Sequence, residues 1–411
     1  MLKRFFRYVD KIFGFPARVA GLRDGRIHAR IPTANVFIAV FTMFVPRLRS
    51  FNALEREPRR PWRWDKLIGG RKPSADTLGY ALCEFEVGPL RDMIAHHHRT
   101  AWRTKAVHAR PGERFRVVAI DGHERWWSTA RECPQCLIRD VTVKVRGERK
   151  ERRRYYHRFV VAQWVGVTPP GILDVERIRP GEGEPVAARR LLDRLLESYG
   201  RLIDVISADA IYLEAPFLRK VLDADKHFVV VMKQEARELY QDAASLRRAM
   251  EPQRIEEGRK TSRIWDLPEL ATFTTLGRPV RVVWAEERTT RNKIIGGEKQ
   301  EVVEEKTWVW VTDLSPAQAT ATRIQRWGHD RWDVENRGFN ELVQHWRMDH
   351  RFIHDPIAIE AILLTLALAF LTTYLFHERN LKPSFRRHLT RLALALRLAE
   401  DPPEVEFAPS G

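Results

Sequence analysis

Three carboxylates stand at positions from which a protein can hold divalent metal ions. Asp121 ends the apolar run RVVAI, Asp209 follows LIDVISA, and Glu335 lies within RWDVEN in a segment with helical spacing. Hard cations such as Mg²⁺ or Mn²⁺ prefer oxygen ligands, and a pair of them can activate the attacking oxygen and stabilise the leaving oxygen in phosphoryl transfer. We therefore expect Asp121, Asp209 and Glu335 to be catalytic metal ligands.

Three other aspartates compete for the second position: Asp140, Asp174 and Asp204. Asp204 lies within an apolar strand, whereas Asp209 follows the end of that strand, where a carboxylate can face a site at the sheet edge. Any one of these acids, taken alone, is an ordinary strand-end or surface residue. The prediction therefore rests on three acids that fall on three elements of one fold.

The elements around these acids predict an α/β fold of the RNase H-like kind, a mixed sheet flanked by helices. Strands are expected at residues 116–120, 138–145, 155–165, 202–207 and 227–232, with helices at 185–199 and 214–223 between them. Residues 331–348 are read as the helix that carries Glu335, and 357–378 as an apolar helix that packs beneath it.

Changes in composition and hydrophobic patterning along the chain predict five regions. They are a helical N-terminal DNA-binding region (1–110), the first part of the core (111–233), a β-rich insertion (234–305), the second part of the core (306–380) and a C-terminal tail (381–411). Residues 274–276 and 281–284 are strand-like pieces of the insertion. The tryptophans in and beside the insertion are expected to fill strand cores, with base stacking as the alternative; they are Trp265, Trp284, Trp308 and Trp310.

The charge balance favours a polyanionic partner. Lys and Arg number 71 against 54 Asp and Glu, which gives a net charge of +17, and a hydrophobic content of 44% excludes a disordered chain. A basic run near residues 146–154 is expected to lie on the DNA backbone, although a solvated turn has the same composition. The residues proposed for DNA contact are Arg149, Lys150, Arg152, Arg153 and Arg154.

The chain has three cysteines, too few for a disulfide framework, which favours a reducing cytoplasm. Cys133 and Cys136 form a CxxC pair, and a structural zinc ion needs two further ligands, for which His157 and His123 are the candidates. Ordinary buried or turn cysteines remain the alternative.

One apolar segment resembles a membrane span. Ala361–Phe376 is shorter than the roughly 20 residues that a span requires, so we predict a buried helix and no membrane partner.

The three acidic segments together resemble the DDE insertion-sequence transposases of the IS-four type. The stretches VVAIDG (117–122), DVISADAIY (204–212) and RWDVENRGFNEL (331–342) carry the resemblance. That family marks its glutamate helix with Tyr-x2-Arg-x3-Glu-x6-Lys. Arg331 and Glu335 match the Arg and Glu of this pattern, while Gly328 and Leu342 stand at the Tyr and Lys positions. The resemblance implies that Arg331 grips a DNA phosphate beside the metal site.

The resemblance implies a transposase that cleaves double-stranded DNA at the terminal inverted repeats of its insertion sequence and transfers the strand into target DNA. It further implies Mg²⁺ or Mn²⁺ as cofactor, a homodimer in the DNA complex, and a bacterial cytoplasmic, nucleoid-associated location. Three alternatives stay open: an RNase H-like nuclease or resolvase without strand transfer, a catalytically inactive DNA-binding relic, and a protein anchored in a membrane through residues 361–376.

Overall fold

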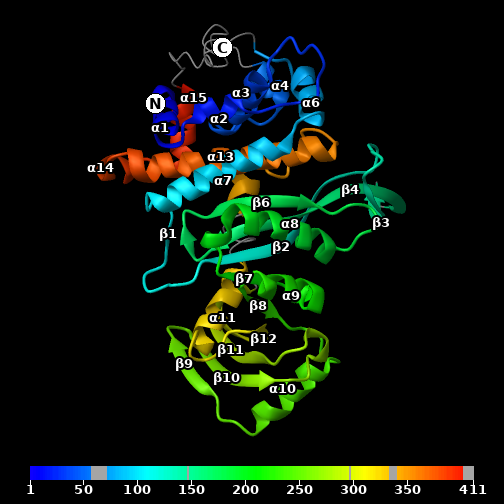
Figure 1. Cartoon of the computed structure of the whole chain (residues 1–411), viewed down its shortest axis with the longest axis vertical. Helices are drawn as coiled ribbons and strands as arrows, with labels where there is room; N and C mark the ends of the chain where they lie inside the picture. Colours follow the sequence, from blue (N-terminus) through cyan, green and yellow to red (C-terminus); the bar gives the residue numbers. More distant parts are fainter. Residues whose placement is uncertain (57–71, 146–147, 296–297, 333–339, 401–411) are drawn as a thin grey trace. The chain divides into compact units, whose positions relative to one another are not determined.

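The chain folds into two compact units in the computed structural model, which describes residues 1–56, 72–145, 148–295, 298–332 and 340–400 (Figure 1). Unit 1 comprises residues 1–112, 122–199 and 335–411, and unit 2 comprises residues 113–121 and 200–334. Strand β2 (Val117–Ser128) begins in unit 2 and ends in unit 1. The sequence predicted that this strand ends at Asp121, but it runs seven residues further, past a positive φ of 53° at Trp126.

Unit 2 is built on a large mixed sheet (Figure 1). The start of β2 pairs in parallel with β7 (Val205–Ala208), and β7 pairs in parallel with β8 (His227–Val231). The sheet continues antiparallel through β12 (Glu298–Thr312), β11 (Val280–Ile295), β10 (Lys260–Leu270) and β9 (Gln253–Glu257). The central strands are apolar because both faces are covered, which is typical of parallel strands in α/β folds. A mixed α/β architecture is therefore confirmed.

Among the described residues of unit 2, three α-helices pack on the sheet. The crossover between the parallel strands β7 and β8 contains α9 (Ala215–Asp223), α10 (Glu238–Arg248) packs on β10, and α11 (Ala321–Asp330) packs on β8 and β10–β12. Thr320 caps α11 by accepting a hydrogen bond from the backbone N–H of Arg323 at 3.3 Å. Short 3₁₀ turns occupy Gly200–Leu202, Ala210–Tyr212 and Thr274–Leu276.

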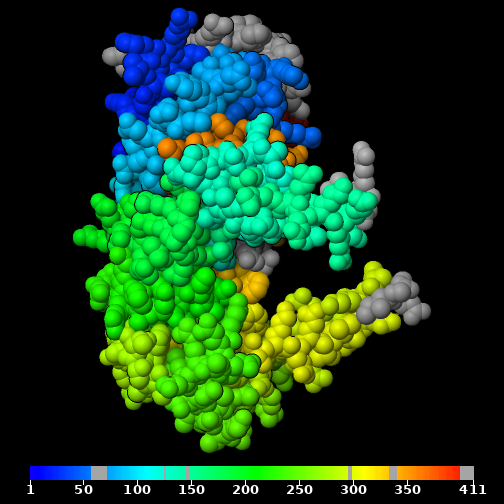
Figure 2. Space-filling view, turned by 90° about the vertical axis from the view of Figure 1, so that its right-hand side faces the viewer, coloured from blue at the N-terminus to red at the C-terminus, as the bar shows by residue number. Residues whose placement is uncertain are grey.

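The region predicted as a β-rich insertion extends the core sheet instead of standing apart from it, because β12 pairs with β8 on one side and β11 on the other. Residues 274–276, predicted as a strand, form a 3₁₀ turn. Strands β11 and β12 continue past the end of β10, which pairs no further than Thr289, and Figure 2 shows this hairpin (yellow) as an arm of unit 2. The predicted domain boundaries stay predictions.

Unit 1 is organised around α13 (Pro356–Asn380). Helices α1 (Leu2–Phe13), α3 (Thr33–Phe44), α6 (Ala75–Cys83) and α7 (Val87–Arg103) pack against it. The described part of the unit also contains the shorter helices α2 (Phe15–Ala20), α4 (Phe51–Glu55), α12 (Asn340–Trp346), α14 (Pro383–Arg386) and α15 (Arg391–Glu400). The helical character predicted for residues 1–110 is confirmed for the described part, while its DNA binding stays a prediction.

Among the described helices, α13 alone is long and apolar enough to cross a membrane by length and composition. With 25 residues it is longer than the apolar run used for the prediction, so length does not exclude a span. However, 89% of its most apolar stretch is buried inside the protein. The prediction of a buried helix over Ala361–Phe376 is therefore confirmed by packing and not by length.

Unit 1 also contains an antiparallel ladder of β3 (Leu137–Val145), β4 (Glu148–Val165) and β6 (Gly171–Arg177). Helix α8 (Glu184–Tyr199) packs on β4 and β6, and β1 (His108–Ala109) pairs with β5 (Val167–Thr168).

Candidate active site

Asp121 and Asp209 are neighbours by strand register. The parallel pairing of β2 with β7 runs from Val117 opposite Val205 to Ile120 opposite Ala208, so the next position on each strand is an aspartate. Adjacent strands lie about 4.8 Å apart, which brings the two carboxylates to one edge of the sheet. The apolar residues before them are fully buried and hold the strands in this register.

Each of these carboxylates contacts a cation. Arg331 is 3% exposed, and its Nη1 donates to Oδ2 of Asp121 at 2.8 Å. The ammonium of Lys233 lies 2.8 and 3.1 Å from the two carboxylate oxygens of Asp209. Burial alone would raise the pKa of Asp209, but the bonds from Lys233 and the backbone N–H of Ala210, with the charge of Arg331, lower it. The surroundings of Asp209 therefore favour its ionised form.

The position of Arg331 follows from the packing of α11. Ser207 of β7 donates its hydroxyl to the backbone carbonyl of Trp327 at 3.2 Å, and the Trp327 indole donates to Glu113 at 3.0 Å. These bonds fix the end of α11 against the strands that carry the two aspartates. Lys233 comes from a different element, because it follows the end of β8.

The glycine at the family's tyrosine position has a packing reason. A Cβ atom at Gly328 would lie 2.0 Å from Nε1 of Trp310, so no side chain fits there while the fully buried Trp310 occupies this space. Leu342, at the family's lysine position, is buried in α12 of unit 1.

The structure brings together two of the three predicted acids. Glu335 lies outside the described residues, and its role as a third ligand stays a prediction.

The competing aspartates have structural partners. Asp204 accepts two bonds from the guanidinium of Arg116, at 2.7 and 2.8 Å, and Asp140 lies 3.5 Å from Arg153 on the exposed β3–β4 ladder. Asp174 accepts bonds from Arg91 and Arg194, both at 2.9 Å. Asp121 and Asp209 are neighbours on paired strands, and each contacts a cation. Two adjacent carboxylates of this kind fit a divalent metal ion better than the three competing aspartates do.

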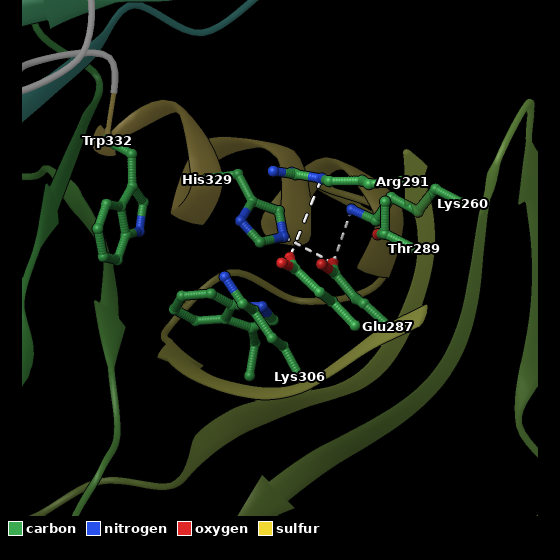
Figure 3. A pocket seen from close by; sticks show the side chains of 9 residues that line it. Lys260, Glu287, Thr289, Arg291, Lys306, His329 and Trp332 are labelled. Carbon is green, nitrogen blue, oxygen red and sulfur yellow. Dashed lines mark hydrogen bonds and ion pairs between the residues drawn. The ribbon is translucent and has the colours of Figure 1, made fainter. Parts of the chain in front are cut away.

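A pocket of about 290 Å³ in unit 2 was missed by the sequence reading (Figure 3). Glu287 forms its floor and accepts from His329 at 2.6 Å and Lys260 at 2.9 Å. Burial would raise the pKa of Glu287, but these two partners lower it to about 2. Trp332, the residue after Arg331, meets Trp308 edge-on at the pocket wall, with ring centroids 5.8 Å apart.

The sequence signal for this pocket is a set of residues that alternate along two strands, and the many charged residues of this segment conceal it. Glu287, Thr289 and Arg291 on β11, and Glu304, Lys306 and Trp308 on β12, are each two residues apart and share one face. Of the four tryptophans considered, Trp265, Trp284 and Trp310 are buried in the strand core, whereas Trp308 is half-buried and lines the pocket.

The predicted basic run lies on the exposed first part of β4, paired with β3. Arg153 faces Asp140, Lys150 lies 3.2 Å from Glu148, and the Arg154 guanidinium lies 4.4 Å from the centre of the Trp127 ring. Arg149 and Arg152 form no ion pair within the described part of the chain. DNA contact through these residues stays a prediction.

Three of the four predicted zinc ligands lie together: Cys133, Cys136 and His157. The fourth choice, His123, is not part of this group, because its ring packs edge-on against Trp126 with centroids 6.2 Å apart. His354 occupies the fourth position, which the sequence analysis had assigned to His123.

Comparison with known protein families adds a second line of support. Residues 172–372 match the family model described as "Transposase DDE domain", a span of just under half of the chain. The matched span contains Asp209, Arg331 and the pocket, while Asp121 precedes it. No curated protein matches the chain. The family match and the paired carboxylates together support a DDE transposase.

Proposed function

We propose that this protein is a DNA transposase that cleaves the ends of its insertion sequence and joins them to target DNA by a metal-dependent mechanism on an RNase H-like core. The observation that carries the proposal is the placement of Asp121 and Asp209 on adjacent parallel strands, with Arg331 bonded to Asp121. Asp121, Asp209 and the predicted Glu335 are the ligands for Mg²⁺ or Mn²⁺. The IS-four subtype, the terminal inverted repeats as substrate and a homodimeric DNA complex belong to the same proposal.

The residues divide the work by chemistry. Bound divalent ions supply an activated attacking oxygen and neutralise charge on the leaving oxygen. Asp121 and Asp209 would hold these ions through their carboxylate oxygens, which contact Arg331 and Lys233 in this structure. With a metal bound at Asp121, Arg331 would be free to present its planar fork to a phosphate of the bound strand.

The test is cleavage and joining on a DNA fragment that carries the flanks of this gene. We expect the full-length protein to nick the element ends and join them to a second DNA with Mg²⁺ or Mn²⁺. Asp121→Asn, Asp209→Asn and Glu335→Gln should bind DNA and not cut. Asp204→Asn is the matched control, since Asp204 pairs with Arg116 and should leave the cleavage rate unchanged.

Each other result selects a different protein. Cleavage without joining would identify a nuclease or resolvase, and DNA binding without cleavage would identify an inactive relic. Cleavage that survives one of the three substitutions would remove that acid from the metal site.

Metal binding has a readout that does not depend on activity. A ligand that binds only the folded state stabilises it by RT ln(1 + [L]/Kd), about 2.7 kcal/mol at a hundredfold excess over Kd. We therefore expect Mg²⁺ to raise the midpoint of thermal unfolding of the wild type and of Asp204→Asn, but not of Asp121→Asn or Asp209→Asn. Equal shifts in all four proteins would place the metal elsewhere.

A further inference from the structure

Two cysteines and two histidines from three distant segments converge within unit 1. Cys133 and Cys136 lie in the loop between β2 and β3, His157 lies on β4, and His354 lies just before α13. Their ligand atoms all lie within 4.8 Å of one another. Cys136 and His157 are buried, and the other two side chains are half-buried.

Three of the distances between these atoms lie in the range of a tetrahedral zinc site, and the distance from His354 to Cys136 is shorter. Zinc–ligand bonds of about 2.3 Å to sulfur and 2.0–2.1 Å to nitrogen place neighbouring ligand atoms about 3.4–3.8 Å apart. The Sγ atoms of Cys133 and Cys136 are 3.6 Å apart, and Nε2 of His157 lies 3.5 and 3.8 Å from them. Nε2 of His354 lies 3.0 Å from Sγ of Cys136. Both histidines therefore present Nε2 to the cysteines, His157 to both sulfurs and His354 to that of Cys136.

The backbone of the CxxC turn directs one N–H donor at a cysteine sulfur. The backbone N–H of Cys133 donates to Sγ of Cys136 at 3.2 Å, and the N–H of Cys136 donates to the carbonyl of Cys133 at 3.1 Å. A donor directed at sulfur stabilises the thiolate, which is the form that binds metal. The 3.6 Å separation of the sulfurs excludes a disulfide, whose bond length is about 2.05 Å.

We propose that Cys133, Cys136, His157 and His354 form a structural zinc site. Four protein ligands fill a tetrahedral shell, so the ion has no open position for substrate and contributes to folding and not to chemistry. It joins the loop after β2, strand β4 and the segment that leads into α13. Cys136 and His354 are 218 residues apart, so the ion joins distant parts of the chain that both belong to unit 1. The proposal is independent of the DNA chemistry proposed above.

The first test is the zinc content of the purified full-length protein, measured by elemental analysis. We expect one zinc ion per chain, and loss of that ion in Cys133→Ser and His354→Ala. Cys83→Ser is the matched cysteine control, because Cys83 lies at the end of α6, outside the cluster. His123→Ala is the matched histidine control, and it should keep its zinc; loss of zinc there with retention in His354→Ala would overturn the ligand set.

The second test covers variants that fail to fold. Wild-type protein refolded with Co²⁺ instead of zinc should show the intense visible bands of tetrahedral cobalt and a thiolate-to-cobalt charge-transfer band. Chelation should lower its thermal midpoint. A protein without zinc, whose midpoint is unchanged by chelator and whose cysteines all react as free thiols, would overturn the proposal. Loss of two reactive thiols without metal would instead identify a redox pair and overturn it equally.

Discussion

Two regions of this protein bring acids and arginines together, and they use them differently. In unit 1, Arg91, Arg190 and Arg194 surround Asp174, Glu176 and Glu360. In unit 2, Asp121 and Asp209 contact Arg331 and Lys233. Both regions contain buried or half-buried ion pairs, and residue type alone does not tell them apart.

The difference lies in how the cations are held. In unit 1 each arginine also donates to a backbone carbonyl: Arg91 and Arg194 to Val175, and Arg190 to Arg177. These bonds fix the arginines whatever the carboxylates do. In unit 2, Arg331 and Lys233 reach the paired aspartates from separate elements, and the proposed metal ions would take their place. Redundant bonds are typical of a structural network, and exchangeable cations beside adjacent carboxylates are typical of a reaction site.

The largest expected effect concerns Arg331. Arg331→Gln should lower the cleavage rate by about 100-fold, because one well-placed donor to a transition-state charge contributes about 10²–10³ in rate. Single-turnover cleavage of an end fragment measures this. Arg323→Gln, on the same helix α11 and 4.0 Å from Glu113, is the control and should cut normally. Cleavage by Arg331→Gln at the wild-type rate would show that Arg331 has a structural role, as the arginines of unit 1 do.

The next largest effect is on the free energy of unfolding, and here the arginine network of unit 1 should be the more sensitive region. Asp174→Asn should lower the free energy of unfolding by about 3 kcal/mol, since it leaves Arg91 and Arg194 without a shared buried carboxylate. Asp209→Asn should change it by less than about 1 kcal/mol, because Lys233 is more than half exposed and can turn to water. Denaturant unfolding of both variants decides this, and equal losses would contradict the distinction between the two regions.

The acids of the candidate site were predictable from sequence because their positions follow from strand ends. Buried parallel strands read as short apolar runs, and a carboxylate directly after such a run falls at the edge of the sheet. Asp121 and Asp209 obey this rule, and their strands are neighbours in the sheet. The cations were only half predictable: Arg331 came from a family pattern, whereas Lys233 has no sequence signal beyond its place after β8.

What the sequence did not predict depends on tertiary contacts. His354 joins Cys136 across 218 residues, and the nearer His123 was the natural but wrong choice for the fourth position of that cluster. The sequence predicted a β-rich insertion but not the length of β11 and β12, because both faces of the outer part of this arm meet water and no apolar alternation marks it. Cross-strand pairs such as Lys293 with Glu304 stabilise it instead. In the sequence, the pair Gly296-Gly297 between two strand-like segments is a hairpin signal that was not used in the prediction.

Two carboxylates, Glu360 of the unit 1 network and Glu287 of the unit 2 pocket, should respond oppositely to pH. Burial raises the pKa of Glu360, and Asp174 and Glu176 add to this effect against the charge of Arg91. Because its folded pKa lies above the ordinary value of 4.5, its contribution to stability is complete below pH 4.5 and is lost as pH rises through the folded pKa. Between pH 5 and pH 8, the free energy of unfolding of Glu360→Gln should therefore rise relative to that of the wild type.

Glu287→Gln is the control for this measurement. The pKa of Glu287 is lowered to about 2, so its contribution is present above pH 4.5 and is lost as pH falls toward 2. Between pH 5 and pH 8 its effect on the free energy of unfolding should stay constant. A Glu360→Gln difference that is equally flat over this range would show that Arg91 fully compensates the buried charge.

The smallest expected effect concerns basic residues that belong to neither of these two regions. Arg149 and Arg152 are exposed on β4 and form no ion pair among the described residues, so they are available for DNA phosphates. Replacing both with serine should weaken DNA binding only several-fold near physiological salt, and equally for all sequences. Each lost phosphate contact should reduce the slope of log K against log salt by about 0.9. Arg248→Ser with Arg254→Ser removes the same charge from unit 2 and should leave the slope unchanged. If both pairs reduce it equally, the effect comes from the net charge of +17 and not from a site on β4.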